Sequence, residues 1–336
     1  MNNKMKDRLD LFMDNYSAIK KDFPWKETTA RMLVALLYAQ EGRAIDFEAF
    51  RQCREIIKQN TGTFSSFRGY VELSLSAQLS MSPNPQLLFA ETIKVYGILT
   101  SAKFHKSFHL AVAAYQIATR CKETEYEGVA NRMRAFYDDM KARHYFQTGD
   151  DDYVFAAMLA LSDLEIATGA ERIEQLFGLI REKVKSKDSA QALAHVLAFS
   201  GADDQAASRT LALREAFKAQ GIKLDAYFTL STFGLLALLP AEADTLVGEI
   251  IEVMTVLREQ KGFGAFSISK EEVFLFAAAL VANDYAEALK GGALAATLSS
   301  TIANIIFIQE IVIMTIIFSI VAANIAAASA ASASQP

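Results

Sequence analysis

The sequence has few of the residues that mark secreted or β-rich proteins. Its 336 residues include two cysteines and five prolines, and no Asn-Gly or Asp-Gly pair separates alternating apolar runs. Two cysteines do not make a disulfide framework, and without hairpin signals there is little support for β-strands. The first 15 residues are mostly polar and lack the apolar segment of a signal peptide. We therefore expect a helical protein with a cytoplasmic location.

Acidic residues outnumber basic residues over the whole chain, and no basic residue follows Lys290. There are 34 Lys+Arg against 39 Asp+Glu, a formal net charge of -5. Nucleic-acid-binding domains usually carry a basic patch or stripe, so we expect no nucleic-acid partner. After Lys290 the only charged side chain is Glu310. A hydrophobic content of 52% excludes disorder for most of the chain.

Short, nearly uncharged Ala/Leu-rich segments recur along the chain. Each segment contains one bulky residue that serves as a reference position, and successive reference positions are 36 to 44 residues apart. They are Leu37, Leu79, Tyr115, Leu159, Leu197, Leu236 and Leu280. The segments themselves cover Ala30–Gln40, Tyr70–Met81, Ser107–Ala118, Tyr153–Ser162, Ser189–Ser200, Tyr227–Leu239 and Val273–Ala282. Each is long enough for one helix.

Amphipathic, charged segments lie between the apolar ones and predict a second helix in each interval. They cover Phe47–Lys58, Gln86–Gly97, Tyr126–Lys141, Glu171–Lys185, Ala206–Lys218 and Ala243–Lys261. A period near 40 residues with two helices per unit is typical of α-solenoids of the HEAT or armadillo kind. We predict an all-α fold, an array of antiparallel helix pairs over residues 1–290, and favour it over a curled helical bundle. Residues 291–336 are expected to form a long apolar helix or hairpin that ends in an Ala/Ser-rich tail.

The apolar C-terminal segment has three interpretations. Its densest part, Asn304–Ile325, has the length and composition of a membrane-spanning helix, provided that Glu310 lies near an interface. The segment could equally be buried in the body of its own chain, or pack against tails of other copies. The residues predicted to contact a membrane or an oligomer partner are Ile305, Phe307, Ile311, Ile313, Ile316, Ile317, Phe318 and Ile320.

Two groups of residues are candidates for binding a metal ion. His105 and His109 are four residues apart, which places both rings on one face if a helix covers them. Asp150, Asp151 and Asp152 offer hard oxygen ligands just before an apolar helix. The alternative for the acidic run is helix capping, as for Asp203 and for the Ser269–Glu272 capping box, and we favour it.

No catalytic signature is present in the sequence. It lacks the glycine-rich phosphate-binding loops and the Gly-x-Ser-x-Gly nucleophile elbow. Arg51 and Arg54 flank Cys53 and could lower the pKa of its thiol, but no histidine is near in sequence. We therefore name no catalytic residue and no cofactor.

Aromatic residues follow several of the amphipathic helices: Phe64, Phe104, Tyr145, Phe146 and Phe263. We expect them to pack back between helix pairs. Trp25, after Phe23-Pro24, is interpreted as a hydrophobic staple at the entry to a helix.

Three stretches of the sequence resemble a known family. They are MLVALLYAQEGRAIDFEAF from Met32, QTGDDDYVFAAMLALS from Gln147 and QKGFGAFSISKEEVFLFAAALVANDY from Gln260. In order and spacing they are similar to the bacterial domain-of-unknown-function family 4003, found mainly in Firmicutes, from about Leu11 to the C-terminus. The resemblance implies an all-helical chain without an established activity or known functional residues.

These features predict a non-enzymatic interaction or scaffold protein. Its partner would be another protein or a second copy, with attachment to the inner face of the plasma membrane if the apolar end inserts. The alternative is a metal-dependent enzyme that uses His105, His109 and Asp150–Asp152.

Overall fold

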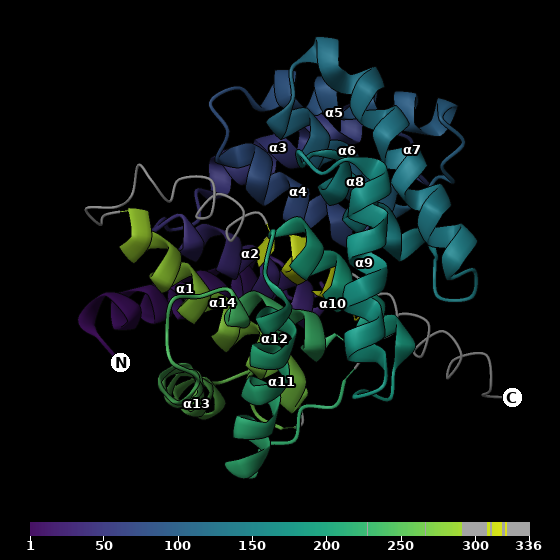
Figure 1. Cartoon of the computed structure of the whole chain (residues 1–336). Coiled ribbons are helices and arrows are strands. Elements are labelled where there is room, and N and C mark those ends of the chain that lie inside the picture. Colours follow the sequence, from purple (N-terminus) through teal and green to yellow (C-terminus); the bar gives the residue numbers. More distant parts are fainter. Residues whose placement is uncertain (227, 266, 291–307, 310, 318–319, 321–336) are drawn as a thin grey trace, which may run out of the picture. The chain divides into compact units, whose positions relative to one another are not determined.

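The computed structural model describes residues 1–226, 228–265, 267–290, 308–309, 311–317 and 320 (Figure 1). All regular elements among these residues are helices. The chain divides into two compact units. Unit 1 comprises Met1–Asp7 and Glu127–Ile313, and unit 2 comprises Arg8–Tyr126 with the residues from Met314 onward.

The helices of the two units follow the predicted alternation. Unit 2 contains α1 (Asn3–Asp22) from Arg8 onward, α2 (Thr28–Gln40), α3 (Phe47–Gln59), α4 (Tyr70–Ser80), α5 (Pro85–Ser101), α6 (Phe108–Arg120) and the 3-10 turn η1 (Glu123–Glu125). Those of unit 1 are α7 (Tyr126–Arg143), the 3-10 turn η2 (Asp150–Asp152), α8 (Tyr153–Ala160), α9 (Ile166–Arg181), α10 (Lys187–Phe199), α11 (Asp204–Ala219), α12 (Thr229–Ala237), α13 (Ala243–Glu259) and α14 (Lys270–Lys290). Each predicted apolar or amphipathic segment contains a helix, although Tyr227 at the start of one segment lies outside the described residues and Glu171–Lys185 is helical only as far as Arg181.

The even-numbered helices from α2 to α14 are the inner ones, because they are buried nearly all round. All eight residues of α8 and all nine of α12 are buried. The odd-numbered helices are the outer ones and bury a single stripe, as in α3, where only Phe50, Cys53 and Ile57 are buried. Residues three and four apart lie on one helix face, so this spacing gives one buried apolar face and one solvent-exposed face.

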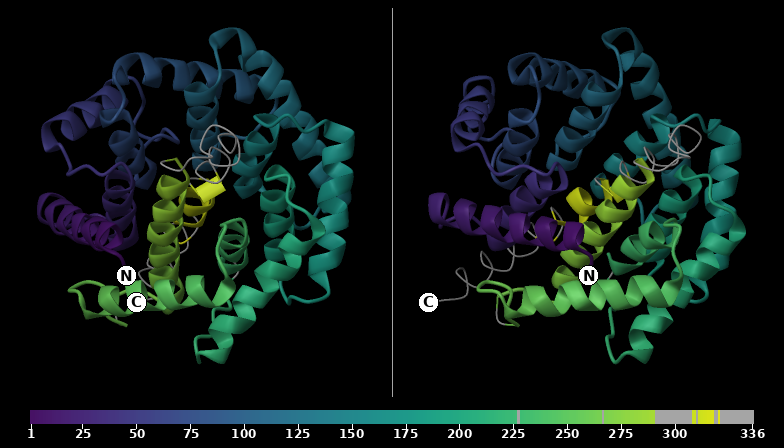
Figure 2. Two further views of the ribbon diagram at one scale, coloured as in Figure 1. Left: turned by 60° about the vertical axis from the view of Figure 1, so that its left-hand side comes forward. Right: turned by 90° about the vertical axis from the view of Figure 1, so that its left-hand side faces the viewer.

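Each unit stacks its helices in two layers. In unit 1 the inner helices α10, α12 and α14 contact one another in sequence, and the outer helices α9, α11 and α13 do the same (Figure 2). In unit 2, α2 contacts α4 and α3 contacts α5. A loop from an outer to an inner helix is called an outer-to-inner joint below, and a loop in the opposite sense an inner-to-outer joint.

Arginines of four outer helices bind backbone carbonyls at the end of the following inner helix. Arg132 of α7 donates to the carbonyls of Ala160, Ser162 and Leu164 at 3.1, 2.9 and 2.8 Å. The other three bonds are Arg8 to Gln40 at 3.4 Å, Arg172 to Ala202 at 2.7 Å and Arg209 to Ala237 at 3.3 Å. The last carbonyls of a helix have no partner within it, so Arg8, Arg132 and Arg209 satisfy helix ends, whereas Arg172 binds the joint just after α10. The sequence analysis did not predict this contact.

The predicted packing of the joint aromatics is correct for two residues and wrong for the others. Phe104 and Phe263 are buried. Phe64, Tyr145 and Phe146 are exposed, and the single tryptophan, Trp25, is 74% exposed instead of forming a staple. The exposed and buried aromatic residues differ in their position within the local turn, which is described below.

The predicted long apolar helix at the C-terminus is not borne out. Most of residues 291–336 lie outside the described residues, including Ile305, Phe307 and Phe318. The described part has short helical pieces at residues 308–309 and 311–317, with Ile320 also helical. No helix among the described residues combines the length and the apolar character needed to cross a membrane.

The described C-terminal residues are enclosed by the protein. Ile311, Ile313, Ile316 and Ile317 are between 0 and 5% exposed. Within unit 1 the Gln309 side-chain amide donates to the Ala279 carbonyl of α14 at 2.9 Å. Of the three interpretations, this conformation matches burial in the chain's own body.

Candidate binding surfaces

The two candidate metal-ligating histidines do not share a helix. α6 begins at Phe108 with Ser107 as its N-cap, so His105 lies in the preceding loop and is exposed. His109 is buried in the first turn, and burial lowers the pKa of its imidazole to about 3. The expectation of two rings on one helix face fails because the helix starts later than the spacing suggested.

The acidic run closes a turn, and its carboxylate at Asp152 accepts no hydrogen bond from the first amides of α8. Asp152 accepts a hydrogen bond from the Gly149 backbone N–H at 2.9 Å across η2. Burial raises the pKa of Asp152 well above its usual value, and the neighbouring Asp151 charge adds to the effect. Burial also raises the pKa of Asp151. The favoured capping interpretation is thus modified: the carboxylate stabilises the turn that leads into the helix.

The other two predicted caps are confirmed. Asp203 accepts from the Ala206 N–H at 3.0 Å at the start of α11. Ser269 and Glu272 form the reciprocal capping box, with bonds of 2.8 and 3.1 Å. Within the part of the chain that the structure describes, no three His, Cys, Asp or Glu side chains form a group that could hold a metal ion.

Cys53 is a core residue and not an activated thiol. It is 1% exposed and lies in a cluster with Ile57, Phe67, Leu79 and Phe89. Burial raises the pKa of the thiol to about 11, so the thiolate is not populated near neutral pH. Arg54 does not lower that pKa, because its guanidinium is bound to Glu72 at 2.9 and 2.7 Å.

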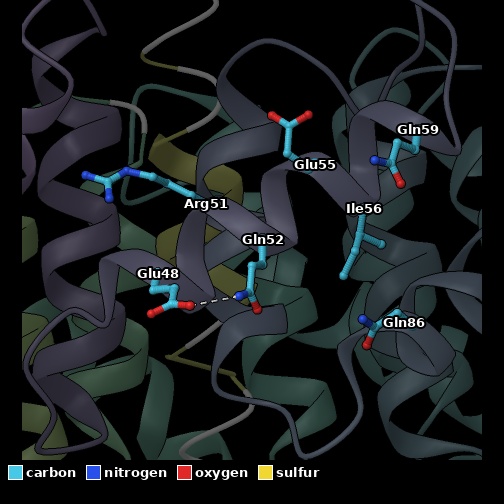
Figure 3. Close-up of a pocket in the computed structure, with 7 residues that line it drawn as sticks. All are labelled: Glu48, Arg51, Gln52, Glu55, Ile56, Gln59 and Gln86. Atoms are coloured by element: carbon cyan, nitrogen blue, oxygen red, sulfur yellow. Dashed lines mark hydrogen bonds between the residues drawn. The ribbon is translucent and has the colours of Figure 1, made fainter.

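A shallow groove of unit 2 lies between α3 and the start of α5 (Figure 3). Its volume is about 430 Å³, and its lining residues are Glu48, Arg51, Gln52, Glu55, Ile56, Gln59 and Gln86. Gln52 donates to Glu48 at 3.3 Å, and Arg51 is ion-paired with Asp22. The charged groups are of both signs and are already partnered in part, so this groove has little preference for a charged ligand.

A second groove, in unit 1, is cationic. Its volume is about 380 Å³, and it lies between the α9–α10 and α11–α12 joints and the C-terminal half of α11. Four basic residues line it, namely Lys185, Arg214, Lys218 and Lys223, against the single carboxylate of Asp225. This is called the cationic groove below.

Two of these four cations have no acidic partner among the described residues. Arg214 pairs with Asp225 at 3.3 Å and Lys218 with Glu215 at 2.9 Å. Lys185 and Lys223 are exposed and form no ion pair with a described residue. An uncompensated pair of ammonium groups beside a concave surface attracts anions.

The ends of two inner helices add to this positive potential. Ser186, which lines the groove, is the N-cap of α10 and accepts from the Ser189 N–H at 3.1 Å. Thr229, the first residue of α12, also lines it. Helix N-termini carry partial positive charge, which falls off within the first turn. The sequence analysis missed this groove because its cations come from a loop, a helix and a second loop, 38 residues apart from Lys185 to Lys223. The Lys-rich stretch at residues 183–187 was the available signal.

Comparisons with known proteins agree with the resemblance seen in the sequence. The family model described as a protein of unknown function (DUF4003) matches residues 15–314. The chain belongs to this family. It is 24% identical over 194 residues to the uncharacterized protein YeaA of Bacillus subtilis (strain 168), which covers 56% of this chain and 58% of YeaA. The chain thus matches less than two thirds of that relative's length. No solved structure matches the chain.

Proposed function

We propose that this DUF4003 member is a non-enzymatic helical-repeat interaction protein that binds an acidic segment of a partner protein in the cationic groove. The observation that carries the proposal is the groove's charge: four basic residues and one carboxylate, with Lys185 and Lys223 unpaired among the described residues.

The stacking of the helix pairs supports a scaffold role. Inner helices contact inner helices and outer helices contact outer ones, and the arginine contacts recur from α7 to α11. Solenoid-like arrays offer extended surfaces suited to protein partners. The cationic groove spans two successive helix pairs, which suits an extended acidic segment.

The metal-dependent alternative receives less support. His105 and His109 differ in exposure and do not share a helix, and the carboxylate of Asp152 is engaged within its own turn. No observation on the described residues favours that alternative over binding.

A charge-reversal experiment tests the proposal. Binding of a fluorescein-labelled deca-glutamate peptide to the full chain is measured by anisotropy at low and high salt, with a deca-glutamine peptide as the neutral reference. We expect salt-sensitive binding of the acidic peptide only, since exposed charges are screened by salt. Lys185→Glu with Lys223→Glu should weaken it by about tenfold or more, or about 1.4 kcal/mol.

The matched control is Lys183→Glu with Lys261→Glu. Both lysines are exposed in outer-to-inner joints of unit 1 and do not line the groove, and the net charge changes equally. If this control weakens binding as much as the groove variant, or if the wild type binds neither peptide, the proposal is wrong.

A further inference from the structure

Three outer-to-inner joints each contain a four-residue turn of the same kind, with an aromatic residue at its third position. Each turn is closed by a hydrogen bond from the N–H of the fourth residue to the carbonyl of the first: Lys26 to Phe23 at 3.2 Å, Ser65 to Gly62 at 3.1 Å and Gln147 to His144 at 3.0 Å. The third residues are Trp25, Phe64 and Phe146, which are 74%, 102% and 92% exposed. Single exposed apolar residues are ordinary on protein surfaces. Three large aromatic rings at the same position of the same turn form a pattern.

The two turns in unit 2 are held in place by buried or half-buried arginines. Arg31 donates to the carbonyls of Phe23 and Pro24 at 3.2 and 2.7 Å, which fixes the turn that carries Trp25. Arg68 donates to the carbonyls of Lys58 and Thr61, each at 2.9 Å, beside the turn that carries Phe64. The aromatic rings are therefore presented to solvent by ordered backbone.

The joints of unit 2 lie along one edge. Arg54 of α3 lies over the Phe23 ring of the first joint at 4.8 Å and binds Glu72 in the first turn of α4, next to the second joint. The Tyr96 hydroxyl of α5 donates to Ser66 in the second joint at 2.9 Å. Tyr96 also hydrogen-bonds to the backbone of Ser107 in the third joint. These contacts link the α1–α2, α3–α4 and α5–α6 joints through the helices beside them, and the three joints are called the aromatic edge below.

The aromatic edge is rich in positive charge. Residues 60–69 and 102–107 contain three cationic side chains, Arg68, Lys103 and Lys106, and no Asp or Glu. The first joint, residues 23–27, adds Lys26 and Glu27, and Arg68 lies 3.8 Å from the Glu72 carboxylate. Lys20 and Lys21 lie in the last turn of α1, next to the first joint. Basic residues are attracted to an anionic leaflet, and Trp is enriched at membrane interfaces.

We propose that unit 2 docks on an anionic phospholipid surface through the aromatic edge, with Trp25 and Phe64 as anchors. A lipid surface fits better than a protein partner because the two rings stand on separate turns with charged residues between them. Neither of the grooves described above is lined by these rings. A fluid interface accepts separate anchors without a complementary pocket.

Trp25 is the single tryptophan of the chain and reports on its own environment. Full-length protein is mixed with vesicles of phosphatidylcholine and phosphatidylglycerol in equal amounts, and with vesicles of phosphatidylcholine alone. We expect a blue shift of the Trp25 emission and its quenching by brominated acyl chains with the anionic vesicles only, reversed by high salt. Absence of quenching, or equal quenching with neutral vesicles, would overturn the proposal.

Variants separate the aromatic edge from other apolar contacts. Trp25→Ala with Phe64→Ala should reduce co-sedimentation with the anionic vesicles at least fivefold, while the melting temperature stays unchanged. The control is Leu87→Ala, which removes a 56% exposed apolar side chain just after the α4–α5 inner-to-outer joint. Equal loss in both variants, or full retention in the double variant, contradicts the assignment; full retention would point to the apolar C-terminal segment as the contact.

Discussion

The two kinds of joint differ in charge and in exposure. The inner-to-outer joints of unit 1, at residues 161–165, 200–203 and 238–242, contain Asp163, Glu165, Asp203 and Glu242 but no Lys or Arg. Arginines of the outer helices reach to the helix ends at these joints. The outer-to-inner joints instead carry the cationic groove in unit 1 and the exposed aromatic turns. The inner-to-outer joints of unit 1 are thus acidic and bound by arginines of the outer helices, whereas the outer-to-inner joints expose cations and aromatic rings to solvent.

The largest effect is expected from Arg132→Ala. This change leaves the carbonyls of Ala160, Ser162 and Leu164 without their donor, and we expect a loss of roughly 2–4 kcal/mol in the free energy of unfolding. Urea denaturation measures it. Arg143→Ala, which removes an exposed pair with Asp139 on the same helix, should cost about 0.5 kcal/mol or less. Equal losses would mean that the arginine contacts do not stabilise the inner-to-outer joints.

The next effect is the pH dependence of stability that is due to the buried His109, with His105 in the preceding joint as its control. The pKa of His109 is about 3 in the folded chain and near 6.5 when unfolded, so only the unfolded chain gains a proton between these values. Stability should therefore fall by up to about 1.4 kcal/mol per pH unit as the pH drops below about 6.5.

His109→Leu should flatten this slope between pH 7 and pH 5, measured by urea unfolding at each pH. His105→Gln, in the exposed joint, should leave the slope as in the wild type. Burial also lowers the pKa of His195 to about 3, and this second group keeps part of the slope in the single variant. Asp152, whose pKa is raised by burial, contributes a slope of the opposite sign in both proteins, so the test is the difference between them. Equal slopes between pH 7 and pH 5 in the wild type and in His109→Leu would refute the interpretation of His109.

A smaller effect is expected at the Ser269–Glu272 capping box of the α13–α14 outer-to-inner joint. Ser269→Ala removes the acceptor for the Glu272 N–H at the start of α14 and should cost about 1 kcal/mol. Thr255→Ala, exposed within α13, should cost nothing because alanine favours helices. Thermal unfolding distinguishes the two, and an unchanged melting temperature for Ser269→Ala would show that the box is dispensable.

The smallest effect is expected at the exposed aromatic turns. Phe64→Ala should change the free energy of unfolding by less than about 0.5 kcal/mol, because the ring buries no surface. Phe104→Ala, in the next joint, removes a buried ring and should be clearly destabilising in the same assay. A marked destabilisation by Phe64→Ala would assign the exposed ring to folding and weaken the contrast between the joints.

Hydrophobic periodicity predicted the helices but not the surfaces. The inner segments, such as Tyr153–Ala160, are apolar at every position, and the outer ones are amphipathic, so both could be recognised one helix at a time. The cationic groove joins Lys185 to Lys223 through tertiary packing, which leaves no local pattern. The prediction that His105 and His109 share a helix face was wrong because α6 begins between them, although their spacing is that of one helix turn.

The aromatic joints show the same limit. Phe263 and Phe64 follow similar glycine-containing stretches, and both look like packing residues in the sequence. In the structure Phe263 is buried, while Phe64 stands at the third position of a turn and is exposed. One position within a turn decides between core and surface, and composition does not carry that information.

Hydrogen exchange of backbone amides in the full chain tests the division of roles between the joints most directly. With deca-glutamate peptide, protection should increase at residues 182–186 and 220–226; with anionic vesicles it should increase at residues 23–27 and 60–69. Exchange at residues 161–165, 200–203 and 238–242 should be unchanged by either. Protection that is confined to these last three loops would contradict the account.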